Sequence, residues 1–264
     1  MSEQWFSLAV PQQAAPHIPL QGLVRLFCFP YAGAAHTAYH AWHHDLLKEV
    51  DLALVKLPGR GMRLGEPHAA SFGSLTDEIS DAIAKSLSGT KSQRFALFGH
   101  SMGALLAFET ARRLHAKHRI VPESLFVSGC SAPSVPRKQT LTNLSDDAFV
   151  EAIAAMNGMP EDIRREPELV AFFLPILRAD IALCEAYRYR PSPPLPCPVT
   201  IFAGDGDNHV PLCDLDDWAQ ETSSGCQKFL YPGGHFFLFQ QQAAILRILR
   251  AGLNSPAEPP YAIA

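Results

Sequence analysis

One serine in this sequence is surrounded by the residue types that a reactive nucleophile requires. Ser101 lies at the centre of Gly99-His-Ser-Met-Gly103, between an apolar run that begins at Phe95 and a helical pattern over residues 105–114. In a G-x-S-x-G turn between a strand and a helix, glycines on both sides of the serine let the two elements approach each other. The free N–H groups and the positive dipole end of the helix point at the serine oxygen. We therefore expect Ser101 to attack acyl carbonyl groups.

Because G-x-S-x-G also occurs in ordinary glycine-rich turns, Ser101 needs suitable partners later in the chain. Hydrolases with this turn carry their acid and their histidine after the serine, in that order. Asp205 and Asp207 follow an apolar run over residues 198–204, and both are candidates for the acid. We favour Asp207, because Asp205 directly follows a glycine and is expected to serve the turn itself.

His235 is the expected catalytic base. It follows Pro232-Gly-Gly, whose glycines let the loop fold toward the strand ends, and it comes after Ser101 and Asp207 in the required order. In this position it would take the proton of the serine hydroxyl while the carboxylate orients its ring. His100 is not expected to be the base, because its side chain would leave the turn in a different direction from that of Ser101.

The elements that must position these residues alternate along the chain. Apolar runs predict strands at residues 23–29, 52–57, 124–130, 198–204 and 227–231, and another after residue 95. Periodic apolar positions predict helices at 37–49, 74–87, 105–114 and 243–253. Such alternation is typical of an α/β fold with a mostly parallel central sheet flanked by helices. The first twenty residues show no convincing period and are expected to form an extended lead-in.

A turn after the first predicted strand supplies a second group that acyl transfer needs. Pro30-Tyr-Ala-Gly-Ala34 directly follows the strand over residues 23–29. In hydrolases of this kind, one oxyanion N–H comes from the loop after this early strand and the other from the residue after the nucleophile. By position, we expect the backbone amides of Ala32 and Met102 to form the oxyanion hole.

The alternation stops between residues 131 and 198, where no strand-like run occurs. Residues 146–157 and 167–190 have helical patterns instead, and Pro175 is expected to kink or split the second helix. We expect a single domain over residues 1–264, with its core at 20–132 and 198–253 and a helical lid inserted at about 133–197. The alternative is that the apolar residues of this insertion only complete the core.

Composition limits the remaining possibilities. The chain has 264 residues, a net charge of −4 and 47% apolar residues, which is typical of a globular protein and does not indicate nucleic-acid binding. Its start lacks a secretion signal, and no apolar segment is long enough to cross a bilayer. Six cysteines without C-x-x-C spacing favour buried free thiols in a reducing compartment. We therefore expect a cytoplasmic protein without a membrane partner.

Two other groups of polar residues have types and spacings that could form binding sites. Four histidines between residues 36 and 44 could share a helical face, but no cysteine lies beside them and H-E-x-x-H is absent, so no metal site is expected. Arg60 and Arg63 could hold a phosphate, but solvated arginines on an exposed turn are the preferred interpretation. No cofactor is expected.

Six segments spread over nearly the whole chain are distinctive in combination. They are Phe29-Pro-Tyr-Ala-Gly33, Leu57-Pro-Gly-Arg60 with Glu66-Pro67, Gly99-His-Ser-Met-Gly103, Phe173-Leu-Pro-Ile-Leu-Arg-Ala-Asp180, Gly204 to Asp207, and Gly233-Gly-His-Phe236. With these segments the chain resembles the stand-alone type II thioesterases that accompany non-ribosomal peptide synthetases and polyketide synthases. The Leu-Pro-Gly-Arg and Leu-Arg-Ala-Asp segments are unusual in general esterases.

The resemblance implies an α/β-hydrolase fold with a helical lid. It also implies hydrolysis of unwanted acyl groups from the 4′-phosphopantetheine arm of an acyl carrier protein or peptidyl carrier protein, and it carries Ser101, Asp207 and His235 over as the triad. We expect a monomer. One departure is Tyr31, where the family often has histidine; because the oxyanion contact is a backbone N–H, the change is expected to alter the pocket wall and not to abolish catalysis.

Two other classes of function remain open from the sequence. A general carboxylesterase or lipase would use the same triad, but it would prefer oxygen esters and be indifferent to a carrier protein. A catalytically silent hydrolase-fold binding module would normally lack part of the triad.

Overall fold

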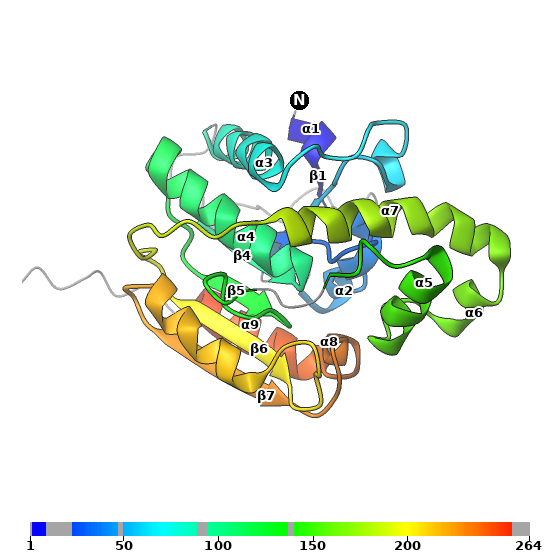
Figure 1. The fold of residues 1–264 in the computed structure, drawn as a ribbon. Helices are drawn as coiled ribbons and strands as arrows, with labels where there is room; N and C mark the ends of the chain where they lie inside the picture. The colour runs from blue at the N-terminus through cyan, green and yellow to red at the C-terminus, as the bar shows by residue number, and fades with distance from the viewer. Residues whose placement is uncertain (1, 9–22, 47–49, 89–93, 137–139, 255–264) are drawn as a thin grey trace, which may run out of the picture.

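Seven strands form the central sheet in a computed structural model that describes residues 2–8, 23–46, 50–88, 94–136 and 140–254 (Figure 1). The strands are β1 (Phe6–Leu8), β2 (Val24–Phe29), β3 (Val50–Val55), β4 (Phe95–His100), β5 (Leu125–Ser128), β6 (Val199–Gly204) and β7 (Cys226–Tyr231). Their order across the sheet is β1-β3-β2-β4-β5-β6-β7, with β1 antiparallel to β3 and all other neighbours parallel. The expected mostly parallel α/β sheet is confirmed.

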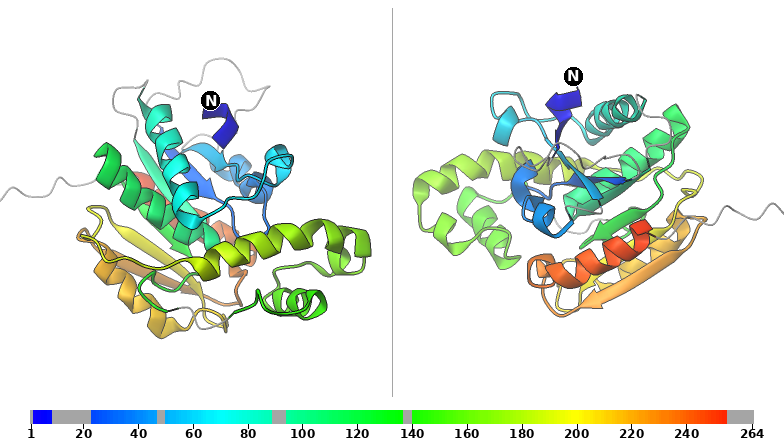
Figure 2. Two further views of the ribbon diagram at one scale, coloured as in Figure 1. Left: turned by 45° about the horizontal axis from the view of Figure 1, so that its top comes forward. Right: turned by 180° about the vertical axis from the view of Figure 1, so that it is seen from behind.

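Helices cover both faces of this sheet (Figure 2). They are α1 (Ser2–Trp5), η1 (His36–Tyr39), α2 (Trp42–Leu46), η2 (Gly61–Arg63), α3 (Phe72–Leu87), α4 (Met102–Arg113), η3 (Leu114–His118), α5 (Asp146–Ala155), α6 (Glu161–Arg164), α7 (Pro167–Ala186), η4 (Leu212–Glu221), α8 (Phe237–Gln240) and α9 (Gln242–Asn254). The apolar side chains of α3 and α4 belong to one hydrophobic cluster, and those of α2 and α9 belong to another.

The strands contribute to both clusters because successive side chains of a strand point to opposite faces of the sheet. In β2, Phe27 and Phe29 belong to the cluster of α3 and α4, whereas Leu26 and Cys28 belong to the cluster of α2 and α9. A strand covered on both faces needs an apolar residue at nearly every position. This is why the strand runs in the sequence are continuous and do not alternate.

The turn from β4 into α4 brings three pieces of backbone close together. A Cβ added at Gly99 would lie 2.0 Å from the carbonyl oxygen of Gly103, and one at Gly103 would lie 2.2 Å from the carbonyl oxygen of Phe29. Any larger residue would push α4 away from β4 or from the end of β2. The two glycines therefore hold the start of α4 directly against the carboxyl ends of the central strands.

Between β5 and β6, the described residues form three helices, α5, α6 and α7, and no strand of the sheet. The long helix α7 crosses the molecule on the outer side of α4, and α5 and α6 lie near its N-terminal half (Figures 1 and 2). A small apolar cluster joins α5 to α7; its buried members are Phe149, Ile153, Met159 and Leu177. The insertion thus has a small hydrophobic core of its own.

Of the two outcomes expected at Pro175, a kink or a split of the second helix of the insertion, the split does not occur. Helix α7 is continuous from Pro167 to Ala186, and it ends before the expected Arg190. A proline inside a helix removes one backbone hydrogen bond. The residues after Pro175, Ile176 and Leu177, are buried, so the packing of this turn keeps the helix continuous through the proline.

Three further local predictions differ from the structure. Residues 2–8 form α1 and β1 and are not an extended lead-in, while residues 9–20 lie outside the described part of the chain. The helix expected over 37–49 is divided into η1 and α2, with the buried Tyr39 and Trp42 on the two sides of the break, and residues 47–49 lie outside the described part of the chain. Helix η4 was not predicted; its Trp218 is fully buried and donates through Nε1 to the carbonyl of Cys130 at 2.9 Å.

Candidate active site

Ser101 occupies the turn between β4 and α4 in an unusual backbone conformation. Its φ is 54° and its ψ is −119°. For a residue with a side chain, such a conformation costs about 1–3 kcal/mol and persists only where the surroundings enforce it. The N–H of Ser101 donates to the carbonyl of Ser128 at 2.8 Å, and its carbonyl accepts from the N–H of Ala104 at 3.0 Å. The neighbouring strand and helix thus hold the turn that presents the serine side chain.

Hydrogen bonds join three of the predicted site residues, which come from three separate loops. The Nε2 atom of His235 lies 3.0 Å from Ser101 Oγ, and its Nδ1 lies 2.7 Å from Asp207 Oδ2. The other oxygen of Asp207 accepts from the backbone N–H of His209 at 2.8 Å. His235 and Asp207 are each only 8% exposed. This geometry allows the imidazole to take a proton from the serine while the carboxylate holds its far nitrogen.

The electrostatics of the site favour an ionised carboxylate next to His235. Burial raises the pKa of Asp207, but the hydrogen bond and charge of His235, together with the N–H and charge of His209, bring it below its usual value. An ionised Asp207 makes Nδ1 of His235 the donor, which leaves Nε2 free to accept from Ser101. Burial, and then the charge of His235, lowers the pKa of His209, so the second imidazole stays neutral at pH 7.

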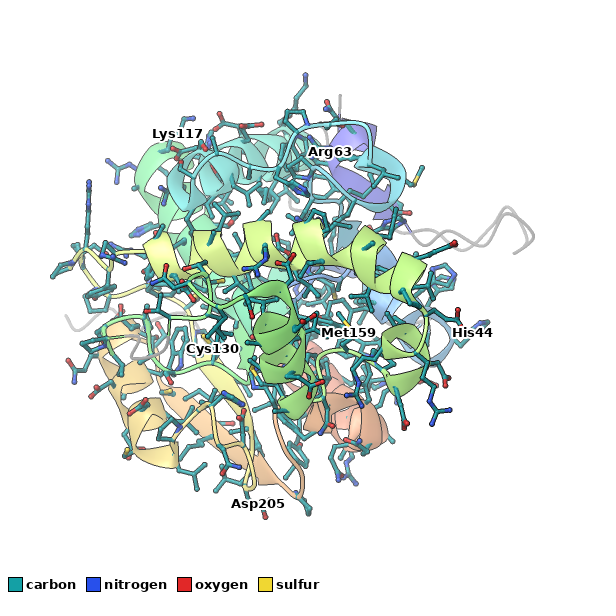
Figure 3. All side chains as sticks on the ribbon, turned by 45° about the vertical axis from the view of Figure 1, so that its right-hand side comes forward. His44, Arg63, Lys117, Cys130, Met159 and Asp205 are labelled. Carbon is teal, nitrogen blue, oxygen red and sulfur yellow. The ribbon has the colours of Figure 1, made fainter. Side chains whose placement is uncertain are left out.

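Asp205, the other candidate acid, has a different position. It is exposed and lies at the outer edge of the molecule in Figure 3. Its Oδ1 accepts from the N–H of Gly233 at 3.1 Å, so it ties the loop after β6 to the loop after β7. Asp205 therefore serves the turn, and its neighbour Asp207 contacts the histidine.

The two backbone amides expected to form the oxyanion hole lie in the turns after β2 and β4. Met102 is the first residue of α4, and Ala32 lies in a turn closed by a 3.0 Å hydrogen bond from the Ala34 N–H to the Tyr31 carbonyl. No described residue accepts a hydrogen bond from the N–H of Met102 or of Ala32. The neighbouring N–H of Gly33, by contrast, donates to Asp180 Oδ2 at 2.8 Å. Both expected amides are therefore available to a developing negative charge.

His100 is the last residue of β4, directly before Ser101, and it is fully buried. Its Nδ1 lies 2.9 Å from Ser128 Oγ, and its ring centroid is 5.1 Å from that of His235. Burial, and then the charge of His235, lowers the pKa of His100 well below its usual value. The ring is therefore neutral, and the imidazole that contacts the hydroxyl of Ser101 is that of His235 and not that of His100.

Tyr31 packs among aromatic rings beside the site. Its ring meets that of Phe236 edge-on at 5.0 Å and that of His100 at 6.0 Å. Tyr31 is not among the residues that line the cavity beside Ser101. Tyr31 instead packs against Phe236, which follows His235, and against His100, which precedes Ser101, so its effect on the pocket wall stays a prediction.

A cavity of about 340 Å³ opens beside Ser101 and His235. The segment after β5 forms one wall, and α7 contributes Ile181, Cys184 and Glu185 to another, with Met156 at the end of α5. Cys130, one of the wall residues after β5, is labelled in Figure 3 beside α5 and α7. The inserted helices therefore border the cavity that contains the candidate nucleophile.

A larger hollow of about 730 Å³ lies elsewhere, on another face of α7, between the start of α3 and the end of α4. It contains none of the predicted site residues. Two of its four arginines are paired with a carboxylate: Arg112 and Arg113 donate to Glu109 at 2.8 and 3.0 Å. The groups suited to acyl transfer lie in the smaller cavity.

The interpretation of Arg60 and Arg63 as solvated arginines is wrong. They are only 5% and 6% exposed. Arg60 binds the carboxylate of Asp180 with both of its terminal nitrogens, and Nη2 lies 2.6 Å from Oδ1. Arg63 donates through Nε to Glu66 at 2.9 Å. Asp180 was not predicted to bind Arg60, because the two residues lie 120 positions apart in the sequence. The only signal in the sequence is that they end the two unusual segments Leu-Pro-Gly-Arg and Leu-Arg-Ala-Asp.

The described part of the chain bears on three other predictions. It contains no group of three or more His, Cys, Asp or Glu side chains that could hold a metal ion, and none of its helices is long and apolar enough to span a bilayer. All six cysteines are free; four are buried, but Cys213 is exposed, which the prediction of buried thiols did not foresee.

A parallel sheet with a strained serine after β4, a carboxylate after β6 and a histidine after β7 defines the α/β-hydrolase class. Within this class, residues 24–253 match the family described as Thioesterase domain. The chain belongs to this thioesterase family, as its sequence segments indicated.

Individual relatives agree with this assignment. Over 247 residues the chain is 35% identical to the Gramicidin S biosynthesis protein GrsT of Aneurinibacillus migulanus, an alignment that covers 93% of this chain and 92% of GrsT. The solved structure of RedJ, a thioesterase from the prodiginine biosynthetic pathway in Streptomyces coelicolor, superimposes with a TM-score of 0.83 at 35% identity, covering 92% and 97% of the two chains. The structure of BorB, the type II thioesterase from the borrelidin biosynthetic cluster, superimposes with a TM-score of 0.81 at 35% identity, covering 95% of this chain and 98% of BorB.

Proposed function

We propose that this protein is a type II thioesterase that hydrolyses acyl groups from the 4′-phosphopantetheine arm of acyl or peptidyl carrier proteins. The observation that carries the proposal is the 3.0 Å hydrogen bond between Ser101 Oγ and His235 Nε2 beside a cavity, in a chain of the thioesterase family. Similarity to BorB, a type II thioesterase, supports carrier-bound acyl groups as the substrate class.

In the proposed acylation step, Ser101 attacks the thioester carbonyl and His235 accepts the hydroxyl proton. The ionised Asp207 stabilises the imidazolium that forms, because it already lies 2.7 Å from Nδ1. The carbonyl oxygen becomes negatively charged and receives hydrogen bonds from the amides of Ala32 and Met102. Loss of one such donor typically costs about 100- to 1000-fold in turnover. Collapse of the adduct breaks the C–S bond and releases the pantetheine thiol, which takes the proton from His235.

The deacylation step uses the same groups with water as the nucleophile. His235 takes a proton from water as the water attacks the acyl-serine, and it then returns the proton to Ser101. The free acid is released and the carrier arm has already left as a thiol. No cofactor is required for either step.

The helices α5 to α7 are proposed as a lid over this cavity and as the part of the monomeric protein that meets the carrier. Their position supports this role, because Met156, Ile181 and Cys184 line the cavity that contains Ser101. The exposed Leu169 and Phe172 on the N-terminal half of α7 give the outer face of the insertion an apolar surface. A docked carrier could bury this surface while its arm enters the cavity.

The proposal is tested by presenting one acyl group in three forms: on a carrier protein, as a pantetheine thioester and as an oxygen ester. We expect the highest kcat/KM for the carrier-bound thioester, because only this substrate offers both the reactive bond and the carrier surface. Ser101→Ala is the control and should remove hydrolysis of all three without loss of folded structure. Equal or faster turnover of the oxygen ester would instead indicate a general esterase.

A further inference from the structure

Asp180 connects the inserted helix α7 with two loops of the sheet. Its carboxylate is only 1% exposed, and Arg60 binds both of its oxygens, with Nη2 2.6 Å from Oδ1. The oxygen Oδ2 also accepts from the N–H of Gly33 at 2.8 Å. One carboxylate thus joins the loop after β3, the turn after β2 and a helix that comes between β5 and β6.

Helix α7 contacts Gly33 in a second way. Gly33 has a φ of +80°, and a Cβ added there would lie 2.4 Å from Cδ2 of Leu177. Leu177 and Asp180 are three positions apart, so they lie on the same face of α7. One of these side chains packs against the α-carbon of Gly33 while the other accepts from its N–H. The position of the turn over residues 31–34 therefore depends on how α7 packs against it.

Arg60 is itself held in place, so Asp180 binds to a fixed partner. The Nε atom of Arg60 donates to the carbonyl of Pro58 at 3.3 Å. A Cβ at the following Gly61 would lie 3.2 Å from that of Ala35, which places the two loops in direct contact. A bidentate arginine–carboxylate pair fixes orientation as well as distance. The carboxylate of Asp180 therefore cannot rotate without breaking several hydrogen bonds.

We propose that Asp180 is a positioning residue for the oxyanion hole. The inference rests on the proposed function, in which the N–H of Ala32 binds the oxyanion. The Ala32 and Gly33 amides belong to successive peptide planes that meet at the α-carbon of Ala32. By holding the second plane, Asp180 fixes the direction of the first. A complete oxyanion hole then exists only while α7 is seated over the site, which couples the inserted helices to the chemical step.

The first test compares Asp180→Asn with Asp51→Asn. Asp51 is a matched control, because it is 5% exposed and paired with Arg25 Nε at 2.6 Å, at the start of β3 and away from the site. In Asp180→Asn, the new amide NH₂ must face a donor, either the Gly33 N–H or the guanidinium of Arg60. We expect kcat on an acyl-pantetheine to fall about 10- to 100-fold with KM changed less than about threefold, whereas Asp51→Asn should leave both within about twofold.

A second measurement separates positioning from general destabilisation. A trifluoromethyl ketone analogue of the substrate forms an anionic adduct with the serine and needs the oxyanion hole, whereas a thioether analogue of the same chain does not. Asp180→Asn should weaken binding of the ketone about tenfold and leave binding of the thioether unchanged. The ratio of the two affinities does not depend on the fraction of enzyme that is folded, so a partly folded variant still gives an answer.

A double variant removes the effect of leaving one buried charge without its partner. Arg60→Met with Asp180→Leu leaves no unpaired buried ion but still leaves the Gly33 N–H without an acceptor. We expect its ketone-to-thioether ratio to stay low. Recovery of this ratio in the double variant, or an unchanged ratio in Asp180→Asn, would overturn the positioning role. A wild-type protein that does not hydrolyse thioesters would refute the proposed function instead.

Discussion

Replacing Gly103 by alanine has two opposite effects on the stability of the protein. Gly103 is the second residue of α4, and in a helix alanine is ordinarily more stable than glycine by about 1 kcal/mol. At this position, however, the new Cβ would lie 2.2 Å from the carbonyl oxygen of Phe29 and 2.9 Å from that of Pro30. Both are backbone atoms, so no side chain can rotate away. The Phe29 contact must open from 2.2 Å to at least 3.0 Å, a movement of about 0.8 Å, and we expect a net loss of about 1–3 kcal/mol.

The same movement separates the two backbone amides of the proposed oxyanion hole. Met102 directly precedes Gly103, and Ala32 follows Phe29 by three positions. A misplacement of about 1 Å in an active site can cost about 100-fold in rate. We therefore expect Gly103→Ala to lower kcat for thioester hydrolysis by about two orders of magnitude, beyond what its loss of stability explains.

Thermal melting and steady-state hydrolysis of an acyl-pantetheine measure the two effects. Gly65→Ala is the control, because no atom lies within 4 Å of the Cβ it would gain. We expect Gly103→Ala to melt a few degrees lower, at about 2–4 °C per kcal/mol for a chain of this size, and Gly65→Ala to match the wild type. The reasoning fails if Gly103→Ala melts at or above the wild-type temperature and keeps more than about a third of its activity.

Three other variants test separate parts of the site. Asp207→Asn should lower kcat about 10⁴-fold, as expected for a triad carboxylate, whereas Asp205→Asn should stay within about threefold; the reverse order, measured in the same hydrolysis assay, would move the acid to Asp205. The lowered pKa of His100 means that the folded state resists its protonation, so stability is lost as pH falls below the unfolded pKa of about 6.5. In urea unfolding, the wild type should lose up to about 1.4 kcal/mol more than His100→Gln between pH 7.5 and 5.5, and equal losses would contradict this reading. Ser101→Gly should relieve the strain at φ 54° and unfold with a free energy about 1 kcal/mol higher than Ser101→Ala, both being inactive; equal stabilities would show that the turn is not strained.

The sheet could be predicted because its central strands are covered on both faces. The runs that end at Phe29, His100 and Gly204 contribute to two hydrophobic clusters and are therefore apolar at nearly every position. Strand β1 was missed because three residues are too few to show a period, and it forms by pairing with β3 at the sheet edge. The division between η1 and α2 was likewise not revealed by local periodicity.

The candidate triad could be named from residue types and chain order, because Ser101, Asp207 and His235 each follow a predicted strand. The structure adds the distances between them. The Arg60–Asp180 pair could not be predicted, since two residues 120 positions apart meet only after α7 has packed across the sheet. Local reasoning interpreted Arg60 as exposed for the same reason. Contacts that depend on the inserted helices lie beyond what strand and turn patterns specify.

The most direct test of a serine-based thioesterase is to trap the acyl-enzyme. An acyl-pantetheine is mixed with the wild type, quenched within milliseconds to seconds, digested and analysed by mass spectrometry, with Ser101→Ala in parallel. We expect the acyl mass on the peptide that contains Ser101, decaying as free acid appears, and neither adduct nor hydrolysis in the variant. An adduct on another residue, or undiminished hydrolysis by folded Ser101→Ala, would contradict the mechanism.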